Sequence, residues 1–143
     1  MERILVTGSS GLLGRSLVSH LQSLCLDVRT FRSANFNLEE PAQAEHLFRA
    51  NSDVDTVFHL AAAVGGIVAH RNNKADYYYR NSVINAVTVH SANKYCKNLK
   101  KIVLVSSACV YPADAPLPLT ESDIWGGWPE PNVQIYGLVK RML

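Results

Sequence analysis

Thr7-Gly8-Ser9-Ser10-Gly11-Leu12-Leu13-Gly14 is the stretch that decides the fold, because it places three glycines at intervals of three between an apolar run and an amphipathic helix. The apolar run at residues 4–7 has the length of a buried strand. This order predicts a tight turn from strand to helix, with Gly8 in the turn and Gly14 where the helix packs close to the strand. Bare backbone at Gly11 would let an anion approach the amino end of the helix.

The anion that best suits such a turn is the pyrophosphate of a dinucleotide, and a plain tight turn is the alternative. A carboxylate that binds the ribose diol of NAD usually follows about 20 residues later. Here the corresponding stretch is Arg29-Thr30-Phe31-Arg32-Ser33, without an acidic residue. Arg32 or Arg29 can instead meet a 2'-phosphate, so we expect NADP to be preferred, with NAD as the other possibility.

Apolar runs of strand length alternate with helical patterns along the rest of the chain, which is typical of a parallel sheet covered on both faces. We expect strands at residues 4–7, 28–31, 56–60 and 102–106. The helical spacing of Leu13, Leu17, Leu21 and Leu24 predicts a first helix. A second should open at Pro41 and bury Ala44, Leu47 and Phe48, and a third should run from about Lys74 to Cys96 with Tyr78, Val83, Val87 and Ala92 inward. The predicted class is α/β, a doubly wound parallel sheet.

The amino-acid composition excludes several classes of function. The 143 residues are 48% hydrophobic and 18% charged, with a formal charge of +2. The basic residues are scattered, so nucleic acid is not an expected partner. Three well-separated cysteines suggest neither a disulfide framework nor a zinc site. The longest nearly apolar stretch, residues 60–69, is about half a membrane span, so we expect a soluble, cytoplasmic protein without a membrane segment.

Tyr136 and Lys140 are spaced to project from one face of a helix near the carboxyl end of the chain. The ordinary interpretation is a tyrosine ring that covers a lysine stem. Ser106 and Ser107 follow the fourth strand, and the carboxyl ends of strands are where open parallel sheets bind ligands. In the chemical interpretation, Lys140 favours the ionised form of Tyr136, and Ser107 holds a substrate oxygen by a hydrogen bond during hydride transfer.

Several further segments give the chain its family resemblance: Asp55 to Ala62, Val64-Gly65-Gly66-Ile67, Ser106 to Pro112, Pro129-Glu130-Pro131 and Tyr136 to Lys140. With the glycine turn, they resemble the extended short-chain dehydrogenases, specifically the GDP-L-fucose synthase type of NAD(P)-dependent epimerase/dehydratase. The resemblance implies a Rossmann-like sheet, truncated after about four strands, as one incomplete NADP-binding domain over residues 1–143. A strand order of 3-2-1-4-5-6 would be cut after the fourth strand.

The resemblance also implies a reaction and its residues. GDP-4-keto-6-deoxy-mannose would be epimerised beside its ketone and then reduced by NADPH to GDP-L-fucose. Ser107, Tyr136 and Lys140 would act in the reduction and Cys109 as acid/base in the epimerisation. A buried apolar role is the alternative for Cys109. The residues expected to bind the cofactor are Gly8, Ser10, Gly11, Leu12, Gly14, Arg32, Leu60, Ala61, Ala62, Tyr136 and Lys140.

Three functions stay open: this reductase/epimerase, a redox-neutral enzyme resembling GDP-mannose 3,5-epimerase, and a non-catalytic dinucleotide-binding module. A GDP-sugar is the expected substrate, a homodimer the expected state of the full-length protein, and the isolated chain an inactive fragment. Asn81 matches an asparagine that ties backbone together in relatives, with an exposed helix residue as the alternative. His59 is expected to be a satisfied core histidine, and one or two of residues 77–79, all tyrosines, to be core.

Overall fold

The computed structural model describes residues 1–143, and its backbone divides into two compact units. Unit 1 contains residues 1–62 and 83–105, and unit 2 contains residues 63–82 and 106–143. The elements, in chain order, are β1 (Arg3–Thr7), α1 (Leu12–Ser23), β2 (Asp27–Thr30), α2 (Pro41–Ala50), β3 (Thr56–His59), α3 (Ile67–Asn72), α4 (Lys74–Tyr95), β4 (Lys101–Leu104), the 3-10 turns η1 (Ala108–Val110) and η2 (Glu121–Trp125), and α5 (Gln134–Arg141).

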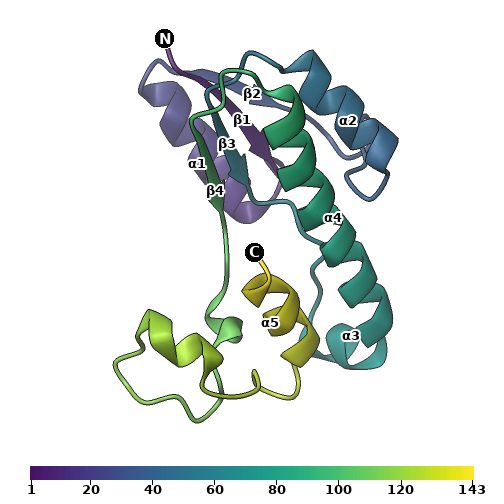
Figure 1. Ribbon diagram of the computed structural model, residues 1–143, viewed down its shortest axis with the longest axis vertical. Helices are drawn as coiled ribbons and strands as arrows, with labels where there is room; N and C mark the ends of the chain where they lie inside the picture. The colour runs from purple at the N-terminus through teal and green to yellow at the C-terminus, as the bar shows by residue number, and fades with distance from the viewer. The chain divides into compact units, whose positions relative to one another are not determined.

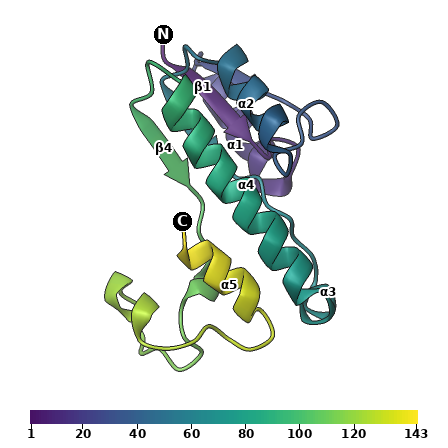
Figure 2. The ribbon, with the colours of Figure 1, turned by 45° about the vertical axis from the view of Figure 1, so that its right-hand side comes forward.

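Unit 1 is a four-stranded parallel sheet of order β2-β1-β3-β4 with helices on both faces (Figures 1 and 2). From β1 the chain moves to β2 on one side, and from β2 it crosses back over β1 to β3 on the other side. Because parallel crossovers are right-handed, this reversal of direction places α1 on one face of the sheet and α2, with the later half of α4, on the opposite face. Ile4, Val6 and Leu21 form the core under α1. The predicted α/β class is confirmed, as are the buried positions of α2, namely Ala44, Leu47 and Phe48.

The strand order differs from the expected one, which places the third strand beside the second. β3 pairs instead with β1, and β2 lies at the edge. The amino-acid composition of the two strands explains the difference. The sequence of β3 is Thr-Val-Phe-His and is mostly buried, whereas β2 is Asp-Val-Arg-Thr and half-buried. Charged residues are tolerated at a sheet edge and protect it from further pairing.

Some positions expected in the core are exposed. Leu13 is 55% exposed and Leu24 56%, because Leu13 lies in the first turn of α1 and Leu24 is the residue that ends it. Tyr78 is 54% exposed, and of the three consecutive tyrosines only Tyr77 is half-buried. The short helix α3 was not predicted, because the sequence before it is uniformly apolar.

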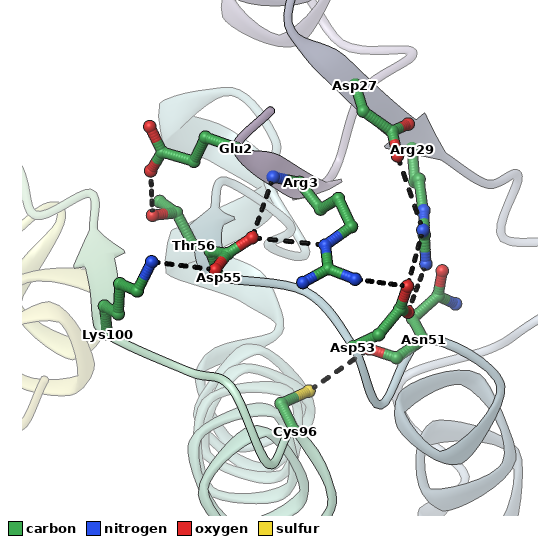
Figure 3. A network of polar contacts seen from close by, with 10 residues as sticks. All are labelled: Glu2, Arg3, Asp27, Arg29, Asn51, Asp53, Asp55, Thr56, Cys96 and Lys100. Carbon is green, nitrogen blue, oxygen red and sulfur yellow. Dashed lines mark hydrogen bonds and ion pairs between the residues drawn. The ribbon is translucent and has the colours of Figure 1, made fainter.

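An ion-pair network lies at the amino-terminal ends of the strands (Figure 3). One Asp55 carboxylate oxygen accepts hydrogen bonds from the Arg3 backbone N–H at 3.0 Å and from Arg3 Nε at 3.2 Å, and the other lies 3.0 Å from Lys100 Nζ. Arg29 Nη1 lies 2.6 Å from an Asp53 oxygen. The Arg29 guanidinium is the main cause that lowers the pKa of Asp53 to about 2. Arg29 is therefore engaged by carboxylates, and it is not the arginine to assign to a 2'-phosphate.

In unit 2, α5 packs on η1. A Cβ at Gly137 would overlap the Cys109 carbonyl oxygen and lie 2.8 Å from Pro129 Cβ, so only glycine allows this contact. No helix in the chain combines the length and apolar character that crossing a membrane requires. No group of three or more His, Cys, Asp or Glu side chains is placed to hold a metal ion.

Candidate active site

The glycine turn of unit 1 requires glycine at its two ends. Gly8 has a φ of +67°, and a Cβ there would lie 2.7 Å from the Ala61 backbone nitrogen. A Cβ at Gly14 would overlap the Gly8 carbonyl oxygen and lie 2.7 Å from Ser9 Cα. At Gly11 the only such neighbour is the Gly8 oxygen at 3.3 Å. The turn is thus closed at both ends and open at Gly11, as a backbone cradle for a ligand must be.

A hydrogen-bonded group at the carboxyl ends of β1 and β3 holds this turn. Thr7 Oγ1 accepts from the backbone N–H groups of Leu60 at 3.2 Å and Ala61 at 3.1 Å. The Thr7 hydroxyl lies 2.9 Å from His59 Nδ1, and His59 Nε2 lies 3.2 Å from Asn85 Oδ1. The hydroxyl donates to Nδ1, and Nε2–H donates to Asn85. His59 is thereby confirmed as a satisfied core histidine, fully buried.

The amino end of α1 and the neighbouring surface suit a phosphorylated ligand. Gly11 caps the twelve-residue helix without a side-chain hydrogen bond, which leaves its first backbone N–H groups for a ligand. A pocket of about 450 Å³ adjoins this turn. Its lining includes Ser10, Arg15 and Arg32 and no acidic residue. These residues fit a dinucleotide with an additional phosphate. Arg15 was not predicted, although its position four residues after Gly11 was the available signal.

Tyr136 and Lys140 lie on one side of α5 in unit 2, with Lys140 Nζ 6.0 Å from the centre of the tyrosine ring. Lys140 is only 4% exposed, and burial lowers its pKa. Burial, together with the charge of Cys109, raises the pKa of Tyr136. This direction is opposite to the expectation that Lys140 favours the ionised phenol. Removal from water is the first cause of this rise, because it disfavours the charged phenolate.

Ser107 caps η1 and Cys109 is its middle residue, and η1 directly contacts α5. Ser107 Oγ accepts a hydrogen bond from the Cys109 backbone N–H at 3.2 Å. Ser106 Oγ donates to the Lys140 carbonyl oxygen at 3.3 Å, which ties the two segments together. All four predicted catalytic residues (Ser107, Cys109, Tyr136 and Lys140) therefore belong to one compact unit.

Asn81 is a buried connector in the same unit, 1% exposed. Its side-chain oxygen accepts from the Ala63 backbone N–H at 2.9 Å, and its Nδ2 donates to the carbonyl oxygens of Ala63 and Tyr77, each at 2.9 Å. The prediction that Asn81 ties backbone segments together is confirmed, and the exposed alternative is wrong.

Comparisons with known proteins identify the relatives. The chain is 31% identical to GDP-L-fucose synthase of Escherichia coli over 142 residues, which is 97% of this chain and 43% of that protein. It is 32% identical to putative GDP-L-fucose synthase 2 of Arabidopsis thaliana over 139 residues, 96% of this chain and 42% of the relative. The chain thus spans less than half the length of these curated relatives.

Two solved structures similar to this chain are also enzymes of GDP-linked sugars. A GDP-mannoheptose C4 reductase from Campylobacter jejuni with NADP bound matches with a TM-score of 0.89 at 26% identity, over 97% of this chain and 43% of the other. A GDP-L-fucose synthetase from Naegleria fowleri bound to NADP matches with a TM-score of 0.85 at 25% identity, over 99% of this chain and 41% of the other. These neighbours support a nicotinamide dinucleotide as cofactor. Residues 4–143 match the model of the NAD dependent epimerase/dehydratase family, and the chain belongs to that family.

Proposed function

We propose that the protein is an NADP-dependent reductase and epimerase of a GDP-linked 4-keto sugar, similar in reaction to the GDP-L-fucose synthases. The observation that carries this proposal is the grouping of Ser107, Cys109, Tyr136 and Lys140 in one unit, with Lys140 and the tyrosine on one side of α5. The glycine turn and the pocket at Arg32 supply the complementary feature, a place for a phosphorylated dinucleotide.

Each residue has a distinct part in this reaction. A dinucleotide held at the glycine turn, Gly8 to Gly14, would supply the hydride that the carbonyl carbon accepts. Tyr136, a neutral phenol whose pKa burial raises further, gives its phenolic proton to the carbonyl oxygen, so that the ketone becomes an alcohol. Ser107 donates a hydrogen bond to the same oxygen, and Lys140 stabilises the phenolate left behind. Cys109 exchanges a proton with the carbon beside the ketone on one face, and inversion of that carbon requires a second acid/base group, which is not among these four residues, to exchange the other proton on the opposite face.

Cofactor binding is tested on the chain as it stands. Fluorescence titration should show tighter binding of NADPH than of NADH. Arg32→Ala should remove most of that preference, about 10–100-fold, because a charge-assisted hydrogen bond contributes about 1.5–3 kcal/mol and each 1.4 kcal/mol is a factor of about ten. Arg71→Ala, an exposed arginine of unit 2, is the matched control. Equal affinity for the two dinucleotides would contradict the NADP assignment.

Turnover is tested with GDP-4-keto-6-deoxy-mannose, on this chain and on any longer natural protein that carries it. We expect the 143-residue chain alone to be inactive. In an active longer protein, Tyr136→Phe should reduce the rate by about 10²–10⁴-fold. NADPH should be consumed in a one-to-one ratio with product. Turnover without loss of NADPH would instead indicate a redox-neutral epimerase, and unchanged function after Tyr136→Phe a non-catalytic dinucleotide-binding module.

A further inference from the structure

His70 is a buried histidine of unit 2 to which the proposed reaction gives no role. It lies on α3, is 7% exposed, and its Nδ1 is buried without a hydrogen-bond partner. His59 in unit 1 has hydrogen bonds to both ring nitrogens. Because a buried polar atom without a partner is unfavourable, hydrogen bonding does not account for the imidazole at this position.

The ring of His70 lies between two tyrosines. Its centre is 4.1 Å from that of Tyr77, with 32° between the planes, and 5.4 Å from that of Tyr136, with 56° between the planes. Favourable aromatic pairs have ring centres about 4.5–7 Å apart. The distance to Tyr136 lies in this range, and the distance to Tyr77 is shorter. His70 thus connects Tyr77 of α4 to the ring of Tyr136, the tyrosine that donates the proton in the proposed reaction.

Tyr77 is in turn seated against Gly65. A Cβ at Gly65 would overlap the Tyr77 hydroxyl and lie 3.2 Å from Tyr77 Cζ, whereas a Cβ at Gly66 would meet nothing within 4 Å. The Val-Gly-Gly-Ile segment therefore contains one glycine that makes room for a tyrosine and one that does not. Gly65, Tyr77, His70 and Tyr136 form a continuous row of contacts, which we call the Tyr136 support.

We propose that His70 is a positioning residue that holds the Tyr136 ring by ring-to-ring contact, and that Gly65 acts through Tyr77 to hold His70. This inference rests on the proposed function, because positioning matters only if Tyr136 reacts. In this proposal the row acts through the shape of its rings, and no proton transfer is assigned to the imidazole nitrogens. His70→Phe should therefore keep the Tyr136 ring in position, whereas His70→Ala should not.

The first test follows Tyr136 itself in the 143-residue chain and needs no turnover. With fluorotyrosine incorporated, the ¹⁹F NMR signal that Tyr136→Phe removes is assigned to Tyr136. Gly65→Ala should shift or broaden this signal by displacing Tyr77. Adding Tyr77→Phe removes the obstructing hydroxyl and should restore the signal, and Gly66→Ala should leave it unchanged. A signal that stays in place in Gly65→Ala, or that Tyr77→Phe does not restore, would overturn the proposed row of contacts.

The second test measures rates in an active protein that carries the chain. Gly65→Ala and His70→Ala should each lower kcat by about 10–100-fold, since a displacement of about 1 Å at a reacting group can cost 10²-fold. The KM for NADPH should change little, and His70→Phe should keep kcat near the wild-type value. Loss of kcat in His70→Phe, or none in His70→Ala, would refute positioning by the ring. Absence of NADPH binding or turnover in the wild-type protein would refute the proposed function instead, and the NMR result would still stand.

Discussion

Asn81→Ala should strongly destabilise unit 2, because one side chain there completes the hydrogen bonding of buried backbone. The substitution leaves the Ala63 N–H and C=O groups without the partners they have at 2.9 Å. Ala63 is itself buried, 8% exposed. Each backbone polar group left unsatisfied in the interior costs about 1–3 kcal/mol, so the expected loss is about 2–6 kcal/mol. That is a large fraction of the roughly 5–15 kcal/mol by which domains are stable.

Urea unfolding monitored by circular dichroism measures this loss, with hydrogen exchange of the Ala63 amide as the local probe. Asn93→Ala is the matched control, because Asn93 lies exposed on the same helix, α4. The two variants have the same change in composition and the same gain in helix propensity. A difference of less than about 0.5 kcal/mol between them, which is the usual range for surface substitutions, would refute the argument. So would unchanged exchange of the Ala63 amide.

Three further predictions concern unit 1. Gly14→Ala should destabilise the unit, since its Cβ overlaps backbone, whereas Gly11→Ala should leave urea stability nearly unchanged and weaken NADPH binding; equal stabilities of the two variants would contradict this. The pKa of Asp53 is lowered from 3.8 to about 2, so its pairing with Arg29 stabilises the fold above pH 4 and is lost as the pH falls towards 2. Asp53→Asn should therefore lower stability at pH 7 and flatten the decline between pH 4 and 2, and acid titrations parallel to wild type would contradict it. Cys25 has a φ of +57°, where side chains are strained by about 1–2 kcal/mol, so Cys25→Gly should raise the thermal midpoint, and a lower midpoint would exclude strain there.

The extent of the long helix was predicted well from the sequence. α4 ends at Tyr95 and the prediction was Cys96, because residues 74–96 contain no glycine or proline that would interrupt a helix. The helix α3 was missed because Ile67 and Val68 continue an apolar run, yet they are 60% and 68% exposed. Hydrophobicity alone does not separate a short surface helix from a buried segment.

The supporting contacts of the candidate site could not be read from the sequence, because they join distant residues. Thr7 contacts the backbone at Leu60 across 53 positions, and only the pairing of β1 with β3 brings the two together. The glycines are different: Gly8 is required by its φ of +67° and Gly14 by clashes with Gly8 and Ser9 of the same turn, so their local pattern was sufficient. Local constraints leave a sequence signature, whereas contacts set by strand order do not.

The pKa of Tyr136 bears on the direction of proton transfer in the two catalytic alternatives. A reduction begins with proton donation by a neutral phenol, whereas an epimerase that first oxidises its substrate needs a phenolate as base. Burial and the Cys109 charge raise the pKa of Tyr136, which makes the phenolate rarer at neutral pH. A redox-neutral epimerase runs this proton transfer in both directions, because it oxidises its substrate and then reduces it again. The raised pKa of Tyr136 therefore suits the reductive direction of either reaction, and the NADPH consumed per product is the quantity that separates the two.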